Sequence, residues 1–172
     1  MSDQGLAAYL RSLGWDEADR SADAAATTER MRHVGFVSNE TAEGFSGRYL
    51  GLRIEHPPAL SISGRNITSW TLLDPTAVCT ARDANVAERC AAVAGTPGFP
   101  VGVDSFHLTL YAGEDGAFYA GFDSSVFRYG RDAEEFFHIS EKASGPACEA
   151  IGPFREGYGI PATRHVNPPW SF

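Results

Sequence analysis

The sequence predicts a single α+β domain, in which helices flank a central antiparallel or mixed β-sheet. Three observations favour this class. The chain has 172 residues, of which 43% are hydrophobic, as expected for one domain with its own core. Helically spaced apolar residues precede residue 50, and apolar residues alternate in the region 99–122. Helices that come first, then strands and a closing helix, are typical of α+β domains and not of repeated βαβ units.

The N-terminal third is predicted to form three helices. Residues 5–13 place leucine and tyrosine at helical spacing, and an alanine-rich run over 23–33 predicts a second helix. The side chain of Ser38 or Asn39 can cap a third helix, which extends to Leu50.

The next elements are short. Residues 52–56 alternate between apolar and polar side chains, which indicates a strand that ends at the prolines 57–58. Further short strands are expected at 60–63 and 70–73, and a short helix at 83–93.

The clearest local pattern is a β-hairpin with an acidic tip. Apolar residues alternate along 106–112 and again along 118–122, and the glycine-flanked acidic sequence 113–116 turns the chain between them. Asp132, followed three residues later by Glu135, resembles a capping box that opens a last helix.

We assign residues 1–150 to the domain and residues 151–172 to a C-terminal tail. Four prolines in the tail argue against regular structure there, yet the tail also carries aromatic residues: Phe154, Tyr158, Trp170 and Phe172. We expect the tail to dock on the domain, and contact with a partner is the alternative.

Signatures of catalysis and of metal binding are missing. The sequence has no phosphate-binding glycine loop, no HExxH and no zinc-deaminase signature, and its five histidines fall on five separate predicted elements. We therefore expect no catalytic residue, no cofactor and no metal. Its three cysteines form no CxxC pair and are expected to be reduced and mostly buried. A small hydrolase that uses a Cys–His pair is the enzymatic alternative.

Acidic residues outnumber basic ones by 22 to 14, for a net charge of −8. Residues 99–150 alone contain nine acidic and three basic side chains. Nucleic acids and anionic membranes are bound by clustered Lys and Arg, so this balance argues against both as direct partners. The N-terminal sequence lacks a signal peptide, and no apolar run approaches the ~18 residues of a membrane span. We expect a cytoplasmic protein.

The acidic residues of this region are the candidate partner-binding residues: Asp104, Glu114, Asp115, Asp123 and Glu134. A hairpin followed by a capped helix could bring them to one side of the domain. Acidic clusters of this kind attract basic proteins and accelerate association. The alternative is that they cap helices and solvate the surface.

Several short motifs, taken together, resemble the SUKH superfamily of immunity proteins. They are Gly14-Trp15 followed by Arg20, then Gly35-Phe36, the helix end at 49–55, the sequence Phe-Pro-Val-Gly at 99–102, and the Asp115-Gly116 turn before Phe118-Tyr119. The likeness is closest to the third subfamily and covers about residues 5–150. The chain departs from the family pattern at Leu50, where a glycine is usual.

This resemblance implies an α+β fold and a non-catalytic role. SUKH proteins are thought to be antidotes encoded beside polymorphic toxins, many of which are nucleases or nucleic-acid deaminases. The implied partner is a cognate toxin with a basic surface, which the protein would bind stoichiometrically and block. A regulatory protein-binding module of the same fold is a further alternative, and the oligomeric state is left open.

Overall fold

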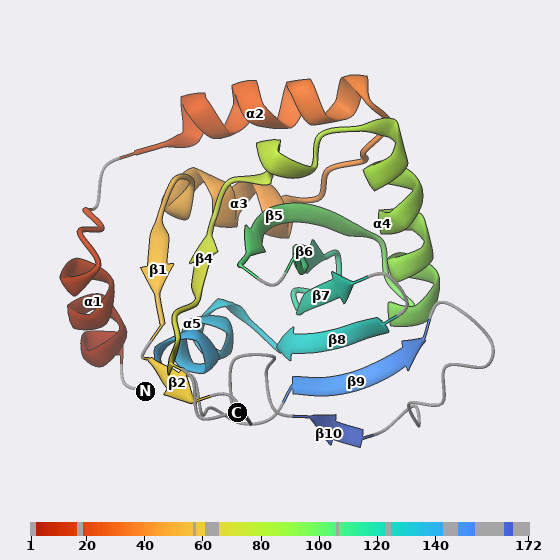
Figure 1. Cartoon of the computed structure of the whole chain (residues 1–172). Helices are drawn as coiled ribbons and strands as arrows, with labels where there is room; N and C mark the ends of the chain where they lie inside the picture. The colour runs from red at the N-terminus through yellow and green to blue at the C-terminus, as the bar shows by residue number, and fades with distance from the viewer. Residues whose placement is uncertain are drawn as a thin grey trace.

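The structure is a computed structural model that describes residues 3–16, 19–56, 58–60, 66–105, 107–122, 125–142, 148–153 and 164–166. Within these residues, eight strands form one antiparallel sheet in the order β1-β4-β5-β6-β7-β8-β9-β10 (Figure 1). The other two described strands, β2 and β3, pair only with each other. The prediction of an α+β domain is confirmed.

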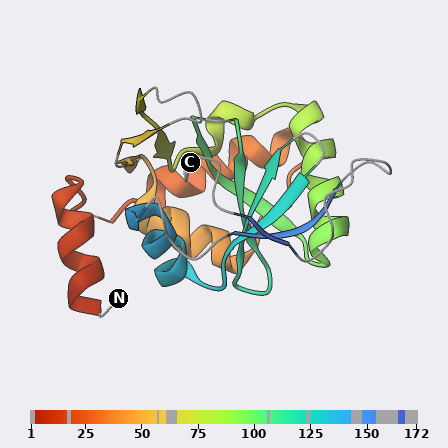
Figure 2. The same ribbon diagram turned by 60° about the horizontal axis from the view of Figure 1, so that its bottom comes forward.

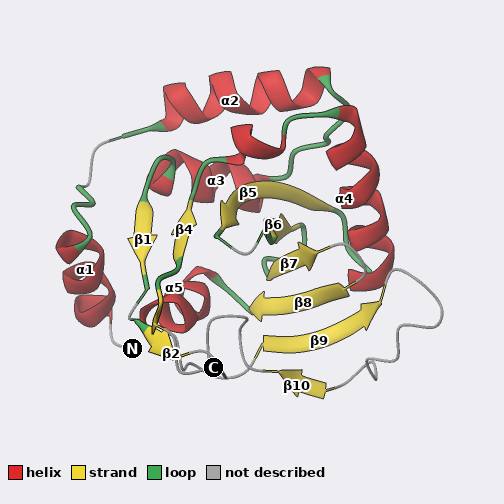
Figure 3. Ribbon diagram, in the orientation of Figure 1, coloured by secondary structure: helices red, strands yellow, loops and turns green. Residues whose placement is uncertain are grey.

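The helices are α1 (Asp3–Ser12), α2 (Ser21–His33), α3 (Glu40–Tyr49), a 3-10 turn (Pro75–Val78), α4 (Ala81–Ala94) and α5 (Ala133–Lys142). The strands are β1 (Arg53–Glu55), β2 (Ala59–Leu60), β3 (Asn66–Ile67), β4 (Trp70–Leu72), β5 (Gly98–Asp104), β6 (Thr109–Gly113), β7 (Phe118–Phe122), β8 (Ser125–Gly130), β9 (Cys148–Pro153) and β10 (Arg164–Val166). Three helices thus precede the sheet, and α4 and α5 interrupt it (Figure 3).

Helices cover both faces of the sheet. Figure 2 shows α4 on one side, and α3 and α5 on the other. α2 packs along α3, and α1 lies at the periphery, near α5 (Figure 1). None of the described helices combines the length and the apolar composition needed to cross a membrane.

The core between the sheet, α3 and α5 is built from aromatic rings. The ring of Phe45, on α3, lies 4.9 Å from Tyr49, 4.7 Å from Phe118, 5.4 Å from Phe136 and 5.8 Å from Phe137, measured between centroids. Contacts between offset or perpendicular rings add to the free energy gained by burying apolar surface. This cluster holds α3 and α5 in fixed positions against β7.

The three N-terminal helices and the hairpin are confirmed. The Asn39 side chain caps α3, because its Oδ1 accepts a hydrogen bond of 2.8 Å from the amide of Ala42. In the hairpin, Leu110 lies opposite Ala120, and Ala112 lies opposite Phe118. The predicted tip 113–116 therefore begins at the last residue of β6 and leads into β7.

One predicted strand begins later than expected. The pattern favoured a strand from residue 106, whereas β6 begins at Thr109. His107 has a φ of 65°, in the left-handed region, so the chain turns sharply before the strand. The backbone amide of Asp104 donates a hydrogen bond to the carbonyl of Leu108 across this turn.

The C-terminal region contains strands that the sequence did not predict. β9 crosses the expected boundary at residue 150, and β10, which falls in the expected tail, pairs with it through Arg164 and Ala150. The expectation that the prolines exclude regular structure is therefore wrong for 151–153 and 164–166. The four aromatic residues of the tail lie outside the described residues, as does 61–63 of the strand expected at 60–63.

Candidate protein-binding surfaces

Three chain segments meet at one end of the sheet. The Asn39 side-chain amide, at the start of α3, donates a hydrogen bond of 2.9 Å to the carbonyl of Ala112, just before the hairpin tip. Phe118, just after the tip, lies opposite Gly130, where β8 leads into α5. The start of α3, the hairpin tip and the start of α5 therefore lie together, as Figure 2 shows for the tip and the β8–α5 connection.

We call this region the acidic end. It is defined by six carboxylates, which are those of Glu40, Glu114, Asp115, Asp132, Glu134 and Glu135. Four of them stand at or beside helix N-termini, where the partial positive charge of the helix favours acidic side chains. The acidic end therefore brings together three of the five predicted partner-binding residues: Glu114, Asp115 and Glu134.

The carboxylates at the start of α5 are held by local hydrogen bonds. Asp132 Oδ1 accepts a bond of 2.8 Å from the amide of Glu135, as a capping residue does. Glu135 Oε2 accepts a bond of 2.7 Å from the amide of Arg131, one residue earlier than in the predicted capping box, and 3.0 Å from its Nε. The hydrogen bond from the Arg131 guanidinium lowers the pKa of Glu135.

Asp115 has a structural role in the hairpin tip. Its Oδ2 accepts a hydrogen bond of 2.6 Å from the Tyr119 hydroxyl, and its Oδ1 accepts one of 3.1 Å from the amide of Ala117. Burial, followed by the hydrogen bond to Asp115, raises the pKa of Tyr119 to about 12. A side chain at Gly113 would collide with Asp115, which explains the glycine at the start of the tip.

Another predicted partner-binding residue, Asp104, is not part of this surface. Asp104 is only 3% exposed, and its Oδ1 accepts a hydrogen bond of 2.8 Å from the amide of Leu108. Asp104 is the last residue of β5. The tip lies at the other end of this strand, where the first residue, Gly98, pairs with Gly113. The prediction for Asp104 is corrected, because alternation along the sequence could not show that its carboxylate is needed inside a turn. Asp123 lies outside the described residues.

The structure adds Glu40 and Val37, which the sequence analysis did not select. Glu40 and Glu114 are exposed, and their carboxylates form no hydrogen bond or ion pair with the described part of the chain. Val37, two residues before the α3 cap, is 76% exposed and is the one large hydrophobic residue, among those described, with such exposure. The position of Glu40 directly after the predicted cap was the signal that could have identified it.

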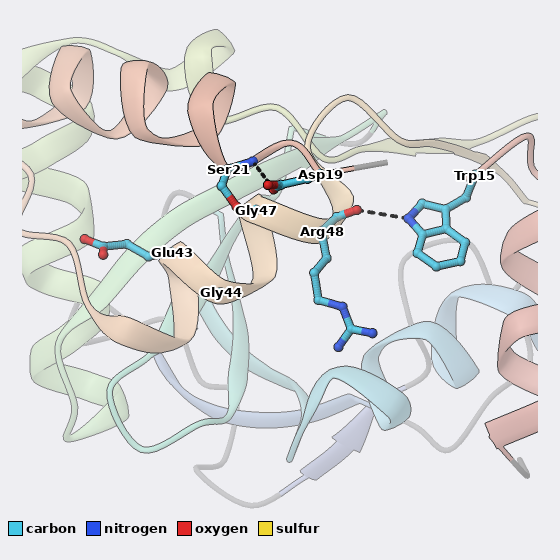
Figure 4. Close-up of a pocket in the computed structure, with 7 residues that line it drawn as sticks. All are labelled: Trp15, Asp19, Ser21, Glu43, Gly44, Gly47 and Arg48. Atoms are coloured by element: carbon cyan, nitrogen blue, oxygen red, sulfur yellow. Dashed lines mark hydrogen bonds between the residues drawn. The ribbon is translucent and has the colours of Figure 1, made fainter. Parts of the chain in front are cut away.

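A second candidate surface lies between α2 and α3. The two helices are brought together where the amide of Arg20 donates a hydrogen bond of 3.1 Å to the carbonyl of Gly47. One hollow of about 490 Å³ is lined by Trp15, Asp19, Ser21, Glu43, Gly44, Gly47 and Arg48 (Figure 4). A second hollow of about 380 Å³ is lined by Ser21, Ala24, Ala25, Thr28, Arg32, Glu43 and Gly44. The hollows share three residues and form one α2–α3 groove.

Charged residues stand at both ends of the α2–α3 groove. At one end, the Trp15 indole N–H donates a hydrogen bond of 2.9 Å to the carbonyl of Arg48 (Figure 4). The Arg48 guanidinium lies 5.6 Å from the centre of the Tyr49 ring. At the other end, Arg32 forms an ion pair of 2.9 Å with Glu43.

Two motifs noted in the sequence shape the α2–α3 groove and its surroundings. Trp15, which follows Gly14, lines the groove itself. The end of α3 departs from the family pattern at Leu50, but Gly51 adopts the left-handed conformation there, with a φ of 83°. A glycine therefore still makes the turn from α3 toward β1, one residue later.

Cys90 does not have the properties of a nucleophile. Cys90 is buried, and this burial raises the pKa of its thiol to about 12, whereas an attacking thiol needs a lowered pKa. Cys79 is half-buried. Among the described residues, no group of three or more His, Cys, Asp or Glu side chains could hold a metal ion.

Comparison with protein families gives one match. The model of the SUKH-3 immunity protein family matches residues 2–139, which is most of the chain. No curated protein and no solved structure matches. The matched region includes both the acidic end and the α2–α3 groove. The chain belongs to the SUKH-3 family of immunity proteins, which indicates a role in toxin immunity.

Proposed function

We propose that the protein neutralises a cognate bacterial toxin in the cytoplasm by binding the toxin domain stoichiometrically. Binding would cover the active site or the substrate groove of the toxin. The observation that carries this proposal is the match to the SUKH-3 immunity protein family over residues 2–139. Immunity proteins are generally non-catalytic, so the proposal assigns no catalytic residue and no cofactor.

We further propose that the toxin domain is basic, as a nuclease or a nucleic-acid deaminase would be. A groove that binds phosphates carries clustered Lys and Arg, and an acidic surface of a partner protein can cover such a groove. The net charge of −8 and the convergence of six carboxylates at the acidic end support this assignment.

Within the acidic end, Glu114, Glu134 and Glu40 are proposed to face the toxin. Asp115 contributes chiefly by holding the hairpin tip that presents Glu114, since both of its carboxylate oxygens accept internal hydrogen bonds. The exposed Val37 can add an apolar contact beside these charges. Asp123 stays a proposed contact.

The test uses the polypeptide encoded by the adjacent reading frame. That polypeptide should be toxic when expressed alone, and co-expression of this chain should restore growth. The two should purify as a complex of fixed stoichiometry, with an affinity that falls as the salt concentration rises. The proposal is wrong if the adjacent product neither harms the cell nor binds this chain.

A charge-reversal pair then tests the acidic end. Glu114→Lys should slow association about threefold to tenfold at low salt, and raising the salt concentration should reduce the difference. Glu88→Lys is the matched control, since Glu88 is exposed on α4 and the change in net charge is identical. Equal association rates for the two variants would remove Glu114 from the interface.

A further inference from the structure

The outer face of α3 carries a glycine that contacts within the described chain do not explain. A Cβ atom at Gly47 would lie 3.3 Å from the Ser21 hydroxyl oxygen, so the contact with α2 favours glycine there. A Cβ atom at Gly44 would meet no described atom from another part of the chain within 4 Å. Apart from proline, glycine is the least favourable residue inside a helix. Gly44 therefore weakens α3 without relieving a contact inside the domain.

Gly44 lies where the two hollows of the α2–α3 groove meet. Beside it, Ala25 and Ser21 present small side chains from α2. Because Gly44 has no side chain, another polypeptide could approach the backbone of α3 closely at this point. The shape of the groove therefore fits a chain segment laid along α2 and α3.

The charge at the ends of the α2–α3 groove limits what can occupy it. No carboxylate of the described residues lies within 4.0 Å of the Arg48 guanidinium. At the opposite end, by contrast, Arg32 is already paired with Glu43. Asp19 lines the same hollow as Arg48, but its Oδ1 already accepts a hydrogen bond of 2.9 Å from the amide of Ser21. The complementary occupant therefore carries an acidic group that reaches Arg48, and none at the Arg32 end.

We propose that the α2–α3 groove holds a segment of the toxin's polypeptide chain. Its backbone or a small side chain would lie over Gly44, and one of its carboxylates would pair with Arg48. This inference rests on the proposed function and adds a second contact to it. The groove adjoins the acidic end, because Glu43 lies three residues after Glu40 on α3. One toxin domain can therefore cover both surfaces.

Filling the α2–α3 groove tests the proposal. Ala25→Leu and Gly44→Leu each place a large side chain in the groove, and Ala26→Leu is the matched control on α2, since Ala26 is exposed and does not line the groove. With the adjacent-frame polypeptide as the probe, the two groove variants should weaken binding at least about tenfold, mainly through faster dissociation. Ala26→Leu should bind within about twofold of the unchanged protein.

A second pair tests the charge. Arg48→Ala should weaken binding about threefold to tenfold, whereas Arg82→Ala, an exposed arginine on α4 with the same change in net charge, should not. Thermal unfolding of every variant separates loss of contact from loss of fold, because Leu at position 44 is expected to strengthen α3.

The outcomes distinguish this inference from the proposed function. If the unchanged protein binds the adjacent-frame polypeptide, and the folded Ala25→Leu and Gly44→Leu variants bind equally well, the groove proposal is wrong and the proposed function stands. If the unchanged protein does not bind that polypeptide, both fail. Sedimentation of the free protein should show that filling the groove leaves its mass unchanged. A dimer that Ala25→Leu dissociates would assign the groove to a second copy of this chain and overturn the proposal.

Discussion

The acidic end and the α2–α3 groove are neighbouring surfaces that differ in the density of their charges and in the size of their side chains. At the acidic end, carboxylates are concentrated, and several of them already accept hydrogen bonds from the protein, as Asp115 and Glu135 do. In the middle of the groove, Ser21, Ala25 and Gly44 have small side chains or none, and no carboxylate of the described residues lies within 4.0 Å of the Arg48 guanidinium at its end. A high density of charge is therefore a poor measure of how many charges a partner can use.

The comparison also separates two contributions to binding. Exposed charges such as Glu114 act over distance and mainly raise the rate of association, so salt weakens their effect. A groove that accepts a segment acts at contact and mainly lowers the rate of dissociation. Both surfaces depend on α3, whose first turn belongs to the acidic end and whose outer face forms the floor of the groove.

The largest expected effect comes from removing the support that both surfaces share. Phe45→Ala deletes the ring at the centre of the aromatic cluster beneath α3 and should lower the free energy of unfolding by ~3–5 kcal/mol. Chemical denaturation measures the loss, and Phe45→Leu, which keeps most of the volume, should cost less. A small effect of Phe45→Ala would mean that the two surfaces do not share this support.

The next effect concerns the acidic end alone. Asp115→Ala removes the acceptor of the Tyr119 hydroxyl and should lower the free energy of unfolding by ~1–2 kcal/mol. The neighbouring Glu114→Ala should change it by less than ~0.5 kcal/mol, because its carboxylate has no partner in the described chain. Equal losses for the two variants would contradict the division between structural and available carboxylates.

A smaller change in the free energy of unfolding, this time an increase, is expected from a substitution in the α2–α3 groove. Gly44→Ala should raise the free energy of unfolding by up to ~1 kcal/mol, since alanine favours the helix and the space above it is open. Gly47→Ala should gain less, because its Cβ would press on the Ser21 hydroxyl. The unfolding midpoint of each variant measures the difference, and a destabilised Gly44→Ala variant would show that position 44 is constrained inside the domain.

The last prediction concerns the loss of the Tyr119 proton, which affects the free energy of unfolding only at high pH. Because the pKa of Tyr119 is raised to about 12, its neutral hydroxyl stabilises the folded state fully below the ordinary tyrosine pKa of about 10, and this contribution is lost between about pH 10 and 12. Unfolding experiments across this range should show a shallower decline in Tyr119→Phe than in the unchanged protein. The decline should not vanish, since Cys90 and Tyr111 also have raised pKa values. Identical declines would show that Tyr119 does not hold its proton more tightly on folding.

Local patterns predicted much of the fold but missed several strands, including β5 and β8 inside the sheet. The first three helices and the hairpin follow from spacing and capping residues, with Asn39 acting as the predicted cap. β3, β5, β8, β9 and β10 were not predicted, because their place in a sheet depends on pairing with partners elsewhere in the chain. The prolines of the C-terminal region were a misleading signal, since β10 contains none of them and Pro153 is the last residue of β9.

By itself, the sequence determined the α+β class, the acid-rich stretch 99–150 and the resemblance that the family match confirmed. Composition and periodicity can be read directly from the amino-acid sequence, because they do not depend on how distant segments pack. Only the tertiary structure decided that Asp104 is buried and that Glu40 joins Glu114 at the acidic end. It also decided that the space above Gly44 on α3 is open. These facts depend on which distant segments pack together. The charge of a side chain follows from its residue type, whereas its burial depends on neighbours that are distant in the sequence.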